Sequence, residues 1–158
     1  MKAPAQIESP RLLLGRPHAG DAGSIFARYA SDPEVTRFLG WPRHQSVEDT
    51  KAFLRFSVEE WKRWPAGPYL IRSRDDGQLL GGTGFGFESP QRAVTGYVLA
   101  KDAWGKHPEH RASWRVLEKC GFVREGSWTR QTEFPNLLPG VLQDVLCYTA
   151  RSQDRSDG

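Results

Sequence analysis

The sequence contains few of the features that mark secreted, membrane or disulfide-stabilised proteins. Its 158 residues include two cysteines, Cys120 and Cys147, which lie far apart among apolar neighbours and predict reduced core thiols rather than a disulfide framework. No apolar run approaches the roughly 18 residues that a membrane span requires, and residues 1–8 lack the apolar stretch of a signal peptide. We therefore expect a cytoplasmic protein with no membrane partner.

The sequence also lacks a large excess of charge of one sign. The chain has 22 basic and 19 acidic residues, interleaved along its length, for a net charge of +3. A nucleic-acid-binding protein usually gathers its basic residues on one helix or one face. The charge pattern is therefore not that of a nucleic-acid-binding protein, and charge alone does not indicate another partner.

The remaining composition is that of an ordinary globular domain, with 38% hydrophobic and 26% charged residues. A chain of this length buries about 68 to 70% of its unfolded surface, so it supports a core without disulfides or metals. We expect a single domain over residues 1–150, followed by a polar tail over residues 151–158.

The spacing of apolar residues predicts short helices and strands in alternation. Strands are expected over residues 7–16, 69–73, 78–87, 94–100, 122–132 and 144–150. Helices are expected over residues 21–30, 46–64 and 108–119. Asp21 is the candidate cap of the first helix, and Ser46 with Asp49 resembles a capping box for the second. The second helix presents one apolar face made of Phe53, Leu54, Val58 and Trp61.

A glycine-rich segment, Gly81-Gly-Thr-Gly-Phe-Gly86, could in principle cradle a phosphate through its backbone N–H groups. A phosphate loop opens a helix, however, whereas Phe85 and Phe87 here continue a strand. We interpret the segment as a strand whose glycines let another backbone come close.

Two other constellations are weaker. His107 and His110 could share a metal ion, but the sequence offers no further ligand cluster and structural zinc usually needs four ligands, so we expect no metal. No Gly-x-Ser-x-Gly motif supports a serine hydrolase, and Ser113 has no evident base beside it.

The connection between the first two expected helices contains Trp41 and His44. An exposed aromatic ring and a histidine in a loop can shape a substrate mouth. The alternative role of Trp41 is that of a packing anchor.

Several stretches resemble one enzyme family. They are Glu8-Ser-Pro-Arg-Leu-Leu-Leu14, Ser31-Asp-Pro-Glu-Val-Thr-Arg-Phe-Leu39, Gly96-Tyr-Val-Leu-Ala100, His107-Pro-Glu-His-Arg-Ala-Ser-Trp-Arg-Val-Leu-Glu-Lys-Cys-Gly-Phe122 and Asp144-Val-Leu-Cys-Tyr148. Together they resemble the GNAT superfamily of acetyl-CoA-dependent N-acetyltransferases, in its RimJ/RimL-like branch. The resemblance implies an α+β (α/β) fold with a mixed, mainly antiparallel sheet and helices on both faces.

The resemblance also implies a reaction: an amine attacks the thioester carbonyl of acetyl-CoA directly, and coenzyme A leaves as a thiol. By position, the backbone at Val98 and Leu99 would polarise that carbonyl. Ser113 matches a serine proposed to protonate the leaving thiolate; the alternative role of its hydroxyl is a hydrogen bond to local backbone within a helix. Glu133 resembles a carboxylate that acts as base in this branch, with one extra residue intervening. Trp41 and His44 are the candidate acceptor-binding residues.

One departure from the family concerns the site for the cofactor's pyrophosphate. Trp104, Gly105 and Lys106 begin the family's phosphate-binding motif, but His107 then opens the segment that in relatives follows a further helix and strand. The resemblance therefore predicts the loss of one central βα module, of about 20 residues or more by average element lengths. His110 stands where relatives carry an asparagine that bonds the cofactor.

Two interpretations remain open at this point. The chain is an acetyltransferase that uses acetyl-CoA to modify a protein N-terminus or a small-molecule amine, with its cleft rebuilt by strand pairing in a homodimer. Alternatively, it is a catalytically inert, internally truncated family member or a binding module.

Overall fold

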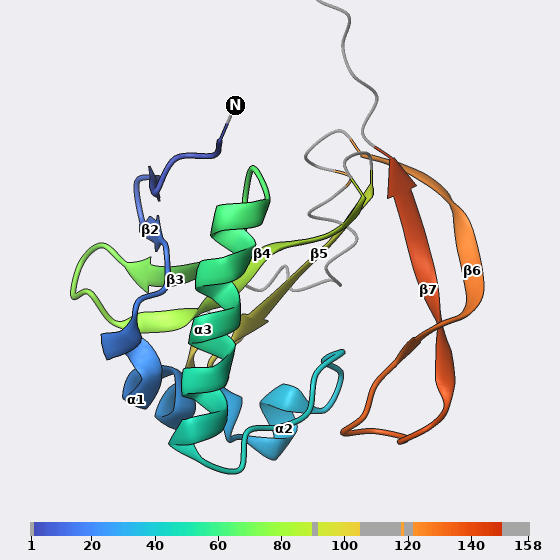
Figure 1. Cartoon of the computed structure of the whole chain (residues 1–158), viewed down its shortest axis with the longest axis horizontal. Coiled ribbons are helices and arrows are strands. Elements are labelled where there is room, and N and C mark those ends of the chain that lie inside the picture. Colours follow the sequence, from blue (N-terminus) through green and yellow to red (C-terminus); the bar gives the residue numbers. More distant parts are fainter. Residues whose placement is uncertain (1, 90–91, 105–117, 119–121, 150–158) are drawn as a thin grey trace, which may run out of the picture.

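The computed structural model describes residues 2–89, 92–104, 118 and 122–149. The strands are β1 (Gln6–Glu8), β2 (Leu12–Gly15), β3 (Tyr69–Ser73), β4 (Leu79–Ser89), β5 (Arg92–Leu99), β6 (Val123–Glu133) and β7 (Leu142–Thr149). The α-helices are α1 (Ala22–Ile25), α2 (Pro33–Thr36) and α3 (Val47–Arg63). The described part of the chain is thus a mixed α+β fold with antiparallel pairing between all neighbouring strands (Figure 1). No helix within it is long and apolar enough to cross a membrane.

The first five strands form one sheet in the order β1-β2-β3-β4-β5. The predicted hairpin at residues 69–87 is confirmed as β3 and β4, which are joined by a turn that includes Gly77 at φ 71°. This positive φ suits glycine, which has no Cβ to clash with the backbone. The predicted strand at residues 94–100 is confirmed as β5, the last strand of this sheet in the described chain.

The expected single strand over residues 7–16 is wrong. The segment folds instead as the β1–β2 hairpin, in which Ile7 pairs with Leu14. The turn is closed by Ser9, whose backbone N–H donates to the Leu12 carbonyl at 2.9 Å and whose Oγ accepts from the Leu12 N–H at 3.0 Å. A serine hydroxyl followed by proline favours such a turn over continued extension.

Helix α3 confirms the predicted capping box, with the Asp49 carboxylate accepting from the Ser46 N–H at 3.0 Å. Its buried face differs from the expected one, because Val58 is 44% exposed and Thr50 and Ser57 are fully buried instead. The buried positions follow the spacing of a single helical stripe. Thr50 and Ser57 are small enough for α3 to pack closely on α1.

The expected helix over residues 21–30 is present, but Asp21 does not cap it as predicted. The helical segment starts at Ala22 as α1 and continues as a π-helical turn over Phe26–Ala30. The Asp21 carboxylate accepts from the His18 N–H at 2.8 Å and pairs with Arg72 at 2.6 Å. The carboxylate therefore stabilises the turn that precedes α1 and connects that turn to β3.

The core lies between the sheet and the helices on one of its faces, where Figure 1 shows α3 beside α1. Its centre consists of Ala22, Ile25, Tyr29, Ala30, Val35, Leu54, Leu70, Leu79 and Ala100. The second predicted face of helices depends on residues 108–119, which lie outside the described residues apart from Glu118.

The predicted strands over residues 122–132 and 144–150 are confirmed as β6 and β7. They form a separate two-stranded sheet, which Figure 1 shows to one side of the five-stranded sheet. In the described part of the chain, no strand pairing joins β5 to this hairpin.

Candidate functional site

One edge of β5 is free of strand pairing among the described residues. The Ala100 N–H donates to the Leu80 carbonyl at 2.8 Å, so the backbone of Ala100 faces β4. Backbone groups alternate in direction along a strand, so the N–H and the carbonyl of Leu99 point away from β4. The Val98 backbone faces β4, and its side chain packs against the core.

Trp104 closes part of this edge. Its indole Nε1–H donates to the Leu99 carbonyl at 2.9 Å, which confirms the outward direction of that carbonyl. The ring itself remains 44% exposed. Leu99 therefore presents an N–H donor at the sheet edge, beside an exposed aromatic ring. These two predicted cofactor-binding residues lie together.

The glycine-rich segment lies within β4, as the strand interpretation predicts. A Cβ at Gly81 would lie 2.0 Å from the Val98 carbonyl oxygen, and one at Gly84 would lie 2.6 Å from Pro68 Cα. These glycines permit close backbone approach and form no phosphate loop. Gly81 lets β5 approach β4 closely, and Gly84 lets the backbone of Pro68 do the same.

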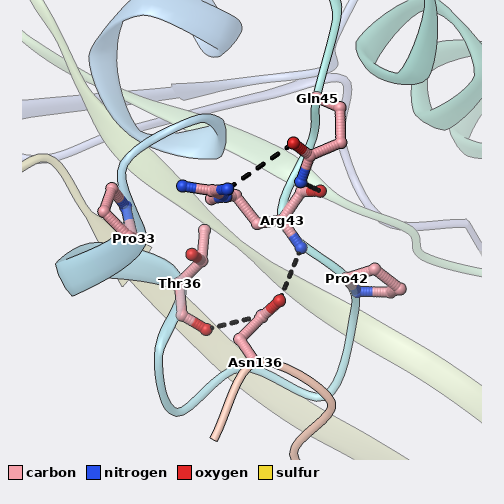
Figure 2. Close-up of a pocket in the computed structure, with 6 residues that line it drawn as sticks. All are labelled: Pro33, Thr36, Pro42, Arg43, Gln45 and Asn136. Carbon is pink, nitrogen blue, oxygen red and sulfur yellow. Dashed lines mark hydrogen bonds between the residues drawn. The ribbon is translucent and has the colours of Figure 1, made fainter.

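A cavity of about 370 Å³ lies next to α2, which contacts β5. Figure 2 shows the residues that line it, namely Pro33, Thr36, Pro42, Arg43, Gln45 and Asn136. The size is within the range of pockets that hold small ligands. No acidic residue is among the lining side chains.

Asn136 joins the two parts of the chain that form this cavity. Its Nδ2 donates to the carbonyls of Thr36 and Trp41, each at 2.8 Å, and its Oδ1 accepts from the Arg43 N–H at 2.8 Å. Asn136 lies in the connection between β6 and β7, about 100 residues from its partners along the chain. A side-chain amide, with both donors and an acceptor, satisfies all three groups.

Trp41 and His44 lie close together, with ring centroids 5.2 Å apart. Trp41 packs against the core, as expected of a packing anchor, and neither residue is among those lining the cavity. The Nδ1 atom of His44 lies 2.8 Å from the hydroxyl of the buried Thr50. Burial lowers the pKa of His44 below its usual 6.5, and the nearby Asp49 carboxylate opposes this shift.

Glu133 ends β6 near the same loop, since a Cβ at Gly40 would lie 4.0 Å from its carbonyl oxygen. Its side-chain Oε1 accepts from the Gly140 N–H at 2.8 Å. The carboxylate therefore holds the connection between β6 and β7.

The other predicted site residues, Gly105, Lys106, His110 and Ser113, lie outside the described residues, as does His107. Within the described ranges, no group of three or more metal-ligating side chains comes together.

Sequence reasoning missed Asn136, Arg43 and the helix α2. A signal for α2 was present, because Asp32 accepts from the Glu34 and Val35 N–H groups at 2.8 and 3.2 Å and Pro33 occupies the first turn. An aspartate followed by proline is a common helix start. The tether made by Asn136 has no local signal.

The family model described as "Acetyltransferase (GNAT) domain" matches residues 11–107, more than half of the chain. The chain belongs to the GNAT acetyltransferase family. Among curated proteins, it is 26% identical over 102 residues to an N-acetyltransferase, p20, of Bacillus licheniformis. That alignment covers 63% of this chain and 57% of the relative.

Solved structures of other acetyltransferases share the GNAT fold of this chain. The ribosomal-protein-S5-alanine acetyltransferase of Vibrio fischeri matches with a TM-score of 0.73 at 16% identity, covering 94% of this chain and 97% of that one. RimL, a ribosomal L7/L12 α-N-protein acetyltransferase solved with coenzyme A, matches with a TM-score of 0.73 at 20% identity, covering 90% and 96%. At such identities, the likeness concerns the fold.

Proposed function

We propose that this GNAT domain transfers the acetyl group of acetyl-CoA to a primary amine of a small molecule or a protein N-terminus. The observation that carries the proposal is the outward-facing N–H of Leu99 at the free edge of β5. A fixed donor of this kind stabilises negative charge that develops on a carbonyl oxygen. The cavity beside α2 is the proposed place for the acceptor.

In this proposal the amine nitrogen attacks the acetyl carbonyl carbon, a C–N bond forms and the C–S bond breaks. The Leu99 N–H donates to the carbonyl oxygen. Ser113 gives a proton to the departing thiolate and regains one from solvent, and Glu133 accepts the proton that the amine loses and releases it to solvent. Because Oε1 of Glu133 accepts from the Gly140 N–H, Oε2 is the oxygen that we assign to that task.

Trp104, Gly105, Lys106 and His110 are the proposed contacts of the coenzyme A portion. The position of Trp104 supports this assignment, because its ring is exposed beside Leu99. Trp41 and His44 support the acceptor cavity from the neighbouring loop, since Trp41 provides one of the carbonyls that Asn136 binds.

A second candidate function, an inert family member or a binding module, is favoured by one specific observation. In the described chain, the β6–β7 hairpin does not pair with β5. The family match also ends at residue 107, where the sequence predicts an omitted βα module. Sequencing the coding DNA across codons 106 and 107 tests that omission.

Thermal unfolding with and without acetyl-CoA distinguishes the two functions. Ligand at 100 times its Kd stabilises the folded state by about 2.7 kcal/mol, so the enzyme is expected to melt at a higher temperature, with AMP as the control ligand. Release of free thiol in the presence of an amine mixture reports turnover. An unchanged melting temperature and no thiol release would support the inert candidate.

Two proline variants test the role assigned to Leu99. Leu99→Pro removes the proposed donor, whereas Tyr97→Pro removes another outward-facing N–H from the same edge. Proline is best tolerated at a sheet edge, so both variants keep the sheet. We expect loss of thiol release in Leu99→Pro alone; equal activities of the two variants would remove Leu99 from the mechanism.

A further inference from the structure

Among the arginines whose burial the structure describes, three have half-buried side chains: Arg28, Arg43 and Arg72. Two of them are neutralised by aspartates. Arg28 makes a two-pronged pair with Asp102 at 2.8 and 2.9 Å, and Arg72 binds the buried Asp21 at 2.6 Å. A partly buried guanidinium is usually compensated in this way, because its desolvation costs free energy.

Arg43 is the exception. Among the described residues, its guanidinium donates one long hydrogen bond, to Gln45 Oε1 at 3.5 Å. No carboxylate among the described residues forms an ion pair with Arg43. Figure 2 shows its guanidinium extending between Gln45 and the Pro33–Thr36 side of the cavity.

The other polar groups of the cavity are already used. Asn136 is committed to three main-chain groups, and the Thr36 hydroxyl donates to the Asp32 carbonyl at 2.7 Å. The Gln45 amide donates to the Arg43 carbonyl at 3.2 Å. The guanidinium is therefore the group left with several donors to offer a ligand.

We propose that the cavity binds a carboxylate of the amine acceptor through Arg43. This inference rests on the proposed function, since it takes the carboxylate to be part of the molecule whose amine is acetylated. A single guanidinium balances the single charge of a carboxylate, and its planar fork matches the two carboxylate oxygens. The acceptors thus include amino acids and peptides with a carboxylate close to the amine.

The position of the cavity suits this task. Helix α2, which contributes Pro33 and Thr36 to the cavity, contacts β5 and is joined to its end by the ion pair of Glu34 with Lys101 at 2.5 Å. An acceptor held by Arg43 is thereby kept near the strand that carries Leu99.

Calorimetry on the full chain, without acetyl-CoA, tests the proposal with two pairs of peptides. The members of each pair differ only in having a carboxylate or an amide at one position. The probes are Ala-Ala with a free carboxylate against Ala-Ala amide, and Ala-Glu amide against Ala-Gln amide. We expect one of the two acids to bind at least tenfold more tightly than its amide. Arg43→Gln is expected to abolish this preference while keeping the main-chain N–H that Asn136 binds.

Two further variants define the cause. Arg43→Lys keeps the charge but loses the fork, so we expect it to retain part of the preference. Arg37→Gln removes a nearby exposed arginine that does not line the cavity and should leave the preference unchanged. Equal binding of acid and amide in both pairs, including no binding at all, or a preference that survives in Arg43→Gln, would overturn the proposal.

Acetyl-CoA binding is measured separately on the same samples. A carboxylate preference without acetyl-CoA binding would refute the acetyltransferase proposal and leave the anion site standing. Acetyl-CoA binding and thiol release without a carboxylate preference would refute the anion site and support the acetyltransferase proposal.

Discussion

Replacement of Asn136 tests whether the β6–β7 connection is fixed to the loop that follows α2. The Asn136→Ala variant removes hydrogen bonds to the main chain of Thr36, Trp41 and Arg43, each 2.8 Å long. A typical hydrogen bond contributes about 1 kcal/mol, and water can reach part of this half-buried site, so we expect a loss of about 2 kcal/mol. At about 2 to 4 °C per kcal/mol for a chain of this size, the melting temperature should fall by about 4 to 8 °C.

The aspartate variant sharpens this prediction. Asn136→Asp keeps an acceptor for the Arg43 N–H but replaces the Nδ2 donor with an oxygen that faces two carbonyls. At pH 7 it should be at least as unstable as Asn136→Ala, and its deficit should shrink at acidic pH, where a protonated carboxyl regains one donor.

Thermal and urea unfolding followed by circular dichroism measures both effects. Gln131→Ala is the matched control, because the Gln131 amide is exposed and, among the described residues, donates to the nearby Thr129 carbonyl at 3.1 Å. If Asn136→Asp were as stable as the unaltered protein, the tether would have no energetic role and the reasoning would be wrong.

Three further substitutions follow from the structure. Gly81→Ala places a Cβ 2.0 Å from the Val98 carbonyl oxygen, so we expect it to unfold the sheet or lower the melting temperature strongly, whereas Gly86→Ala meets open space and should change it little. Ser57→Ala removes a fully buried hydroxyl that has no hydrogen-bond partner in the described chain, so it should leave stability unchanged or raise it; a loss above about 1 kcal/mol in urea unfolding would contradict this. His44 has its pKa lowered by burial, so the unfolded chain binds more protons than the folded one below pH 6.5 and stability falls as the pH drops through this range. His44→Gln should flatten that dependence in urea unfolding at a series of pH values, and an unchanged dependence would contradict the assignment.

Elements with local signals could be predicted from the sequence. The α3 capping box, the turn at Gly77 and the glycine-rich strand all depend on residues within a few positions of one another. Rules for helix caps, for turns and for the alternation of apolar residues in strands therefore predict these elements. The β1–β2 hairpin was missed because the alternation rule was applied across all of residues 7–16, although Ser9 and Pro10 supply a turn signal.

The cavity beside α2 depends on contacts between residues far apart in the sequence, which local sequence rules do not predict. Asn136 reaches across 93 to 100 positions of the chain to bind three main-chain groups. Arg43 has no carboxylate partner among the described residues, and this too can be recognised only by comparing the surroundings of each arginine in space. The face of α3 shows the same limit, since hydrophobicity favours Val58 while close packing on α1 favours the small Ser57.

We propose that acetyl-CoA binds at the edge of β5 that is unpaired among the described residues, and that the Leu99 N–H contacts its carbonyl oxygen. Titration of isotope-labelled protein with acetyl-CoA, followed by the amide resonances of Leu99 and Ala100, tests it most directly. The claim predicts a saturable shift of the Leu99 amide that exceeds the shift of the Ala100 amide, which is already bonded to Leu80. Saturation of binding with an unmoved Leu99 resonance, or no binding at millimolar acetyl-CoA, would contradict it.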